Sequence, residues 1–149
     1  MMKWLLIMFA TAWVAANLNS GAQAQTATHP SINAQLLVAA RQGDLSAVDR
    51  SLARGAAPNS RNRLGKTALL IAAEKGHAGM AERMLAAGVD VNLASLEGVT
   101  PLMAAAYGGH ASIVKKLLDA GAKPGPLDRM KKPAVVYAAG QGHADVIAL

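Results

Sequence analysis

The sequence predicts an all-α solenoid in which helix-turn-helix units stack side by side, joined by short hairpin-like loops. Glycines recur every 33 residues, at Gly43, Gly76, Gly109 and Gly142. Apolar positions, alanine pairs and a second set of glycines keep the same register along the chain. A fixed period of this length indicates a repeat architecture, because one unit cannot bury its apolar face alone and must pack on its neighbours. We therefore expect function on a surface rather than in an enclosed pocket.

The first helix of each unit is short and rich in small residues. In the third unit, Leu102, Ala105 and Ala106 are spaced at i, i+3 and i+4, which places them on one helical face. We expect this helix to end near Gly109. Alanine pairs recur at this place in every unit, as expected for a helix packed closely between two neighbours.

The second helix of the third unit carries one apolar stripe between residues 113 and 118. Lys115 and Lys116 fall on its outer side, and Gly121 predicts a left-handed stop at its end. The polar and Gly-rich segments between units predict turns or short hairpins rather than a third helix.

The motifs of the central units resemble an ankyrin repeat. The third unit reads Gly98-Val99-Thr100-Pro101-Leu102, then Ala105-Ala106, Gly109-His110, Leu117-Leu118 and Gly121-Ala122. The second unit reads Gly65-Lys66-Thr67-Ala68-Leu69, then Ala72-Ala73, Gly76-His77, Leu85, Gly88 and Val91-Asn92. The resemblance implies four ankyrin repeats in residues 33–149, at about 33–62, 63–95, 96–128 and 129–149, the last one incomplete.

The fourth unit departs from this pattern. Lys131 replaces the glycine before the first helix, and Pro133 replaces the threonine. The register would place the closing glycine five residues beyond Leu149, so we expect an unfinished last helix and exposed apolar surface. Two explanations remain open: the chain is a fragment of a longer reading frame, or this end packs against a partner or a second copy.

Residues 1–24 predict a secretory signal peptide. Lys3 precedes an apolar run of thirteen residues from Trp4 to Ala16, and Ala22-Gln23-Ala24 predicts cleavage after Ala24. A helix of that length rises only about 20 Å, against a hydrocarbon core of about 30 Å, which disfavours a membrane anchor. With residues 25–32 as a linker and no cysteine for lipid modification or disulfides, we expect an exported protein, periplasmic or secreted, without a membrane attachment after cleavage.

Catalytic motifs are missing from the sequence, which contains no His-Glu-x-x-His or Gly-x-Ser-x-Gly pattern and no cysteine nucleophile. Gly65-Lys66-Thr67 resembles the end of a phosphate-binding loop, but Ser60 stands where that loop needs its first glycine. The same register continues as Gly98-Val99-Thr100, which favours Thr67 and Thr100 as helix N-caps. We expect neither an enzyme nor a bound cofactor.

The histidines His77, His110 and His143 do not predict a metal site. Stacked units lie on the order of 10 Å apart, whereas histidine nitrogens bind zinc at about 2 Å. The resemblance implies instead a structural role, in which each histidine ties its inter-helix turn to the neighbouring backbone. The aspartates are likewise expected at turns or helix starts, at Asp44, Asp90, Asp119, Asp128 and Asp145.

The resemblance implies partner binding through the hairpin tips and the exposed face of the first helices. In this sequence those positions are Arg41, Arg63, Leu64, Lys66, Glu74, Lys75, Leu96, Glu97, Val99, Tyr107, Arg129, Met130 and Lys132. Tyr107 is the strongest candidate anchor, because tyrosine offers a large amphipathic contact at low entropic cost. The alternative is that Tyr107 packs on its own neighbours.

We therefore expect a non-enzymatic, exported adaptor that binds another periplasmic or secreted protein. An alternative is the recognition part of a longer enzyme, or of a toxin or immunity-type protein, that continues past Leu149. Loss of Lys3 with the signal peptide lowers the formal net charge from +6 to +5. The remaining positive charge favours an acidic partner, or it simply supports solubility. The modest charge and few aromatic residues argue against nucleic-acid binding.

Overall fold

The computed structural model describes residues 31–149, which form eight helices and no strands. The helices are α2 (Ile32–Gln42), α3 (Leu45–Ala53), α4 (Ala68–Lys75), α5 (Ala78–Ala86), α6 (Pro101–Gly108), α7 (Ala111–Asp119), α8 (Ala134–Gly140) and α9 (Ala144–Ile147). The predicted all-α solenoid is confirmed, although α2 begins one residue before the expected start of the first repeat. The predicted signal peptide lies outside the described residues.

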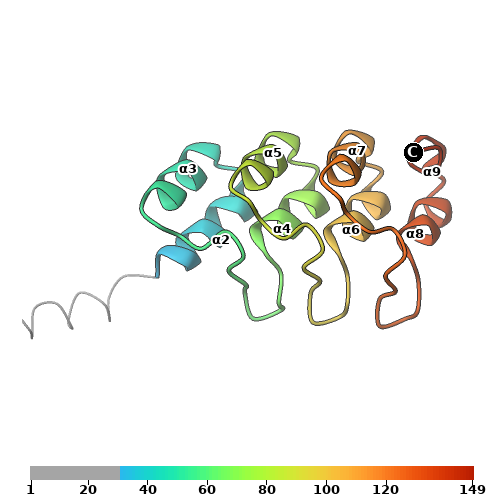
Figure 1. Ribbon diagram of the computed structural model, residues 1–149, viewed down its shortest axis with the longest axis horizontal. Coiled ribbons are helices and arrows are strands. Elements are labelled where there is room, and N and C mark those ends of the chain that lie inside the picture. The colour runs from blue at the N-terminus through green and yellow to red at the C-terminus, as the bar shows by residue number, and fades with distance from the viewer. Residues whose placement is uncertain (1–30) are drawn as a thin grey trace, which may run out of the picture. The chain divides into compact units, whose positions relative to one another are not determined.

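The helices form two parallel rows (Figure 1). The inner helices α2, α4, α6 and α8 make one row, and the outer helices α3, α5, α7 and α9 make the other. Each inner helix contacts its own outer helix, and adjacent inner helices contact each other. The loops before α4, α6 and α8 extend past the inner row, on the side away from the outer helices. A surface made of loops and inner helices is thus repeated along the stack.

Small side chains let the inner helices approach one another. The alanines at the centre of this row are at most 2 % exposed, namely Ala39, Ala40, Ala72, Ala73, Ala105 and Ala106. Longer side chains such as Met80, Met84, Ile113 and Leu117 fill the layer between inner and outer helices and are fully buried. The core is aliphatic and close-packed, as the sequence pattern predicted.

Threonine caps begin the two central inner helices. Thr67 Oγ1 accepts a hydrogen bond from the Leu70 backbone N–H at 3.2 Å, and Thr100 Oγ1 accepts one from Met103 at the same distance. Both residues have extended backbone, as N-caps do, so the predicted capping role is confirmed. The fourth unit has Pro133 at this position, which makes no side-chain cap.

Histidines pack against glycines of the preceding unit. A Cβ atom at Gly76 would lie 2.6 Å from the His110 ring, and one at Gly109 would lie 2.5 Å from the His143 ring. His143 Nε2 also lies 3.1 Å from the Tyr107 carbonyl oxygen, one unit earlier. The structural role implied for this histidine is thus observed at His143.

Two asparagines, Asn59 and Asn92 of the Val91-Asn92 motif, also join adjacent units. Asn59 Oδ1 accepts a hydrogen bond from the Asp90 N–H, and Asn92 Oδ1 accepts one from the Lys123 N–H, both at 2.9 Å. Their spacing of 33 residues is a signal that the sequence already contained.

The expectation for the aspartates holds only in part. Asp44 caps α3 by accepting a hydrogen bond from the Ala47 N–H at 3.0 Å. Asp119 instead ends α7 and forms an ion pair with Lys115, so its expected place at a turn or helix start was wrong. The two residues are one helical turn apart, which brings their side chains together on an exposed face.

The last helix is short, as the register predicted. Helix α9 has four residues, whereas α7 in the preceding unit has nine. Val135, Ile147 and Leu149 are exposed at this end of the stack.

Candidate functional site

The three loops share one hairpin tip, which we define as residues 62–66, 95–99 and 128–132. In each tip the N–H of the first residue bonds the carbonyl of the fifth: Asn62 to Lys66 at 3.0 Å, Ser95 to Val99 at 2.9 Å and Asp128 to Lys132 at 3.2 Å. The fourth residue has a left-handed backbone, with φ of 74° at Gly65, 80° at Gly98 and 60° at Lys131. The predicted hairpin-like loops are therefore well-defined turns.

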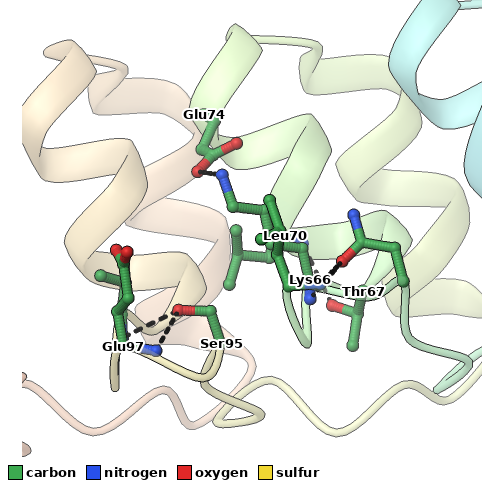
Figure 2. Close-up of polar contacts among 9 residues, drawn as sticks. Lys66, Thr67, Leu70, Glu74, Ser95 and Glu97 are labelled. Atoms are coloured by element: carbon green, nitrogen blue, oxygen red, sulfur yellow. Dashed lines mark hydrogen bonds and ion pairs between the residues drawn. The ribbon is translucent and has the colours of Figure 1, made fainter.

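A polar side chain at the first position holds each tip. Asn62 Oδ1 accepts hydrogen bonds from the backbone of Leu64 and Lys66 at 2.9 and 3.0 Å. Ser95 Oγ does the same for Glu97 and Val99, both at 3.3 Å, as Figure 2 shows. In the third tip, Asp128 Oδ1 accepts from the Lys132 N–H at 2.8 Å. Of these three residues, only Asp128 was expected at a turn; Asn62 and Ser95 were not predicted, although the 33-residue spacing could have identified them.

Adjacent tips are hydrogen-bonded to each other. The Leu96 N–H donates to the Leu64 carbonyl at 3.0 Å, and the Arg129 N–H donates to the Glu97 carbonyl at 2.9 Å. Close approach explains the glycines here, since a Cβ at Gly65 would lie 2.9 Å from the Leu96 nitrogen. The tips are thus joined into one ordered edge.

Large apolar side chains are exposed on this edge. Leu64, Leu96 and Met130 are 60 %, 66 % and 70 % exposed, and Arg63 and Arg129 beside them are exposed as well. An apolar side chain on each successive tip is a feature that the core does not require.

The inner helices contribute a hollow of 340 Å³, which we call the tyrosine hollow. It is lined by Glu74, Val99, Met103, Ala104, Tyr107 and Tyr137. Tyr107 is 56 % exposed, and its ring meets that of Tyr137 edge to face, with centroids 6.0 Å apart and an interplanar angle of 77°. Tyr107 therefore packs on a neighbour and also offers most of its side chain to solvent. Tyr137 was not among the residues predicted to bind a partner.

Tyr137 is held in place by the third tip. Its hydroxyl donates a hydrogen bond to the Asp128 carboxylate. This bond is the main reason why the pKa of Tyr137 rises to about 12, and it also lowers the pKa of Asp128. Asp128 thus organises a tip and orients an aromatic wall of the hollow, rather than capping a helix.

Ion pairs occur on both the inner and the outer side of the stack. Lys66 reaches from the first tip to Glu74 on α4, at 2.6 Å (Figure 2). On the outer helices, ion pairs Arg83–Asp49 and Lys116–Glu82 join neighbouring units.

Five exposed cations at or beside the tips, which we call the tip cations, form no ion pair within the described residues. They are Arg61, Arg63, Arg129, Lys131 and Lys132.

The remaining expected partner-binding residues lie along the same surface. Arg41 and Lys75 are exposed in the last turns of α2 and α4. Glu97 is exposed on the second tip, whereas Val99 is half-buried and lines the tyrosine hollow. Lys66 and Glu74 neutralise each other, which leaves their aliphatic segments as the part available for contact.

Two further findings concern the described residues alone. Within residues 31–149, no group of three or more histidine, aspartate or glutamate side chains is placed to hold a metal ion. No helix in this part of the chain has the length and apolar character needed to cross a membrane.

A family model described as ankyrin repeats, with three copies, matches residues 36–128, which is more than half of the chain. A search of curated proteins found no match. The matched segment begins within α2, extends beyond α7 and includes the first two tips. The chain therefore belongs to the ankyrin repeat family.

Proposed function

We propose that this protein is an exported, non-enzymatic module that binds another periplasmic or secreted protein through its hairpin tips and inner helices. Ankyrin repeats are generally protein-protein interaction modules. The observation that carries the proposal is the row of exposed apolar side chains, Leu64, Leu96, Met130 and Tyr107, along one ordered surface. Because the backbone that carries the tip side chains is already held, binding through them avoids the entropic cost of ordering the loops.

The hydrogen-bonded edge supports this proposal in a second way. Loops that carry exposed apolar groups are commonly mobile, and ordering them on binding weakens affinity. Here the bonds between tips, from Leu96 to Leu64 and from Arg129 to Glu97, order the loops before a partner arrives. Tyrosine and arginine, the residue types enriched at binding hot spots, both lie on this surface.

The proposed function is tested by affinity capture from a periplasmic extract of the source organism, read by mass spectrometry. We expect one protein to be enriched by the native chain and lost with the Tyr107→Ala variant. The matched control is Arg50→Ala, an exposed substitution on outer helix α3, which should capture as the native chain does. Identical capture by all three proteins would contradict binding through this surface.

The exported location is tested separately by the N-terminus of the protein recovered from cells. We expect residue Gln25 to be the first residue, because cleavage is proposed after Ala24. Recovery of the uncleaved chain from the cytoplasmic fraction would contradict export without affecting the binding proposal.

A further inference from the structure

We infer that the partner presents an acidic segment with one bulky apolar side chain, which enters the tyrosine hollow while flanking carboxylates meet the tip cations. This inference rests on the proposed function and specifies the chemistry of the partner at the same surface.

The hollow favours an uncharged occupant. Val99, Met103 and Ala104 supply apolar lining, and two of its polar groups are already engaged: Glu74 pairs with Lys66, and the Tyr137 hydroxyl donates to Asp128. A charged side chain inserted here would lose hydration without an unpaired counter-charge on the walls, whereas an apolar one gains by leaving water. A volume of 340 Å³ is at the lower end of the range for ligand pockets, roughly 300–1,000 Å³, and suits a single side chain.

Two small residues leave room for the hollow. In the 33-residue register, Ala104 corresponds to Ile71 in the preceding unit and to Tyr137 in the following one. Gly140 corresponds to Tyr107, so no side chain from α8 covers the Tyr107 ring at that position. The hollow is thus a local departure from the repeat pattern, and Ala104→Ile would narrow it by placing there the residue that the previous unit uses.

Charge on the tips favours acidic flanks. Arg61 and Arg63 lie at the first tip, and Arg129, Lys131 and Lys132 lie at the third. The second tip between them has Leu96, Glu97 and Val99 and no cation, and Val99 lines the hollow. An extended segment across the three tips would therefore meet positive charge, then the apolar hollow, then positive charge again.

The experiment is selection of a random-peptide phage library on the immobilised purified chain, with counter-selection on the Tyr107→Ala, Ala104→Ile double variant. We expect enriched peptides to combine aspartate or glutamate on both sides with a central Phe, Trp, Leu or Met. Circular dichroism of the double variant confirms that it remains folded.

Fluorescence polarisation then measures the affinity of one enriched peptide for the native chain and for single variants. The comparison separates the contribution of the hollow from that of the tip cations. We expect Ala104→Ile to weaken binding by about tenfold, since the larger side chain occupies part of the space that the partner's apolar side chain would enter. We expect Arg129→Glu to weaken binding about tenfold at low ionic strength, and less at high salt, because exposed charges are screened. Arg50→Glu, the matched charge reversal on an outer helix, should leave the affinity unchanged.

Three results would overturn the inference. Enriched peptides that are basic or lack a bulky apolar residue would overturn it and leave the proposed function standing, because the surface would still bind peptide. Single-stranded DNA that binds more tightly than the selected peptides, and depends on Tyr107 and Arg129, would replace it. No enrichment over the double variant would contradict both the inference and the proposed binding surface.

Discussion

The third and fourth units share one register but differ in how completely it is used. The third has Thr100 capping α6, Gly98 in its tip and a nine-residue outer helix. The fourth has Pro133 without a side-chain cap, Lys131 in the left-handed conformation and a four-residue outer helix. Equivalent residues accordingly differ in burial, since Met103 is 1 % exposed and Val136 is 44 % exposed.

This difference shows that the environment of a residue depends on its neighbouring units as well as on its own. Ala106 is buried between α4 and α8, but its counterpart Ala139 is exposed, although both are alanines in the same register. In a stack with mainly nearest-neighbour contacts, a unit covered on one side has about half the interface of a central unit. Substitutions at matched positions of the two units therefore measure how much stability comes from neighbouring units.

The largest effect should come from truncation at the second residue of the inner helices α6 and α8. Leu102→Ala removes a nearly fully buried side chain and should lower the free energy of unfolding by about 2–5 kcal/mol. Val135→Ala, at the matched position and 52 % exposed, should change it by no more than about 0.5 kcal/mol. Urea denaturation measures both. Equal losses would show that the fourth unit is as tightly packed as the third.

Alanine at the inter-helix glycines should show the next largest difference. Gly109 and Gly142 both have positive φ, 69° and 75°, so alanine strains each backbone by about 1–2 kcal/mol. At Gly109 an added Cβ would also meet the His143 ring at 2.5 Å, whereas at Gly142 it would have nothing within 4 Å.

Gly109→Ala should therefore destabilise by at least about 1 kcal/mol more than Gly142→Ala in thermal or urea unfolding. Adding His143→Ala to both variants should remove most of that difference. A difference that persists without the histidine ring would assign it to another contact.

Lys131→Gly should stabilise the protein by about 1 kcal/mol, because a lysine with φ of 60° is in a conformation that glycine adopts without strain. The reverse change in the third unit, Gly98→Lys, should destabilise it, since a Cβ there would lie 3.2 Å from Asp128 Cα. Urea denaturation checks the signs. Destabilisation by Lys131→Gly would mean that the lysine side chain makes a contribution larger than the backbone strain.

The smallest effect concerns the bond between Tyr137 and Asp128. The pKa of Tyr137 is raised from 10.0 to about 12, so the stabilisation is complete below pH 10 and lost as the pH rises through about 12. The pKa of Asp128 is lowered, so its contribution is present above the usual aspartate pKa of about 3.9 and lost as the pH falls through the folded-state value.

Absorbance titration of tyrosinate should show one of the two tyrosines ionising near pH 12. Tyr137→Phe should remove that step, with folding monitored by circular dichroism at each pH. A titration step near pH 12 that survives in Tyr137→Phe would assign it to Tyr107.

Much of the architecture followed from the sequence because the determinants are local and periodic. The cap residues Thr67 and Thr100 and the left-handed stops depend on residues within one turn of the feature, and the shortened last helix follows from the 33-residue register. The expectation for Asp119 was wrong because this residue is the last of α7, where its side chain forms an ion pair with Lys115. Turn propensity alone did not indicate that place.

The sequence by itself determined the period, the helix pairs, their caps and the row of exposed tip residues, since propensity and steric limits act over a few residues. Only the tertiary structure decided the tyrosine hollow, the hydrogen bond from Tyr137 to Asp128 and the hydrogen bonds between adjacent tips. These features join residues of neighbouring units, and their distances depend on how the units stack. A repeat pattern shows which positions are equivalent, whereas packing determines which of them meet.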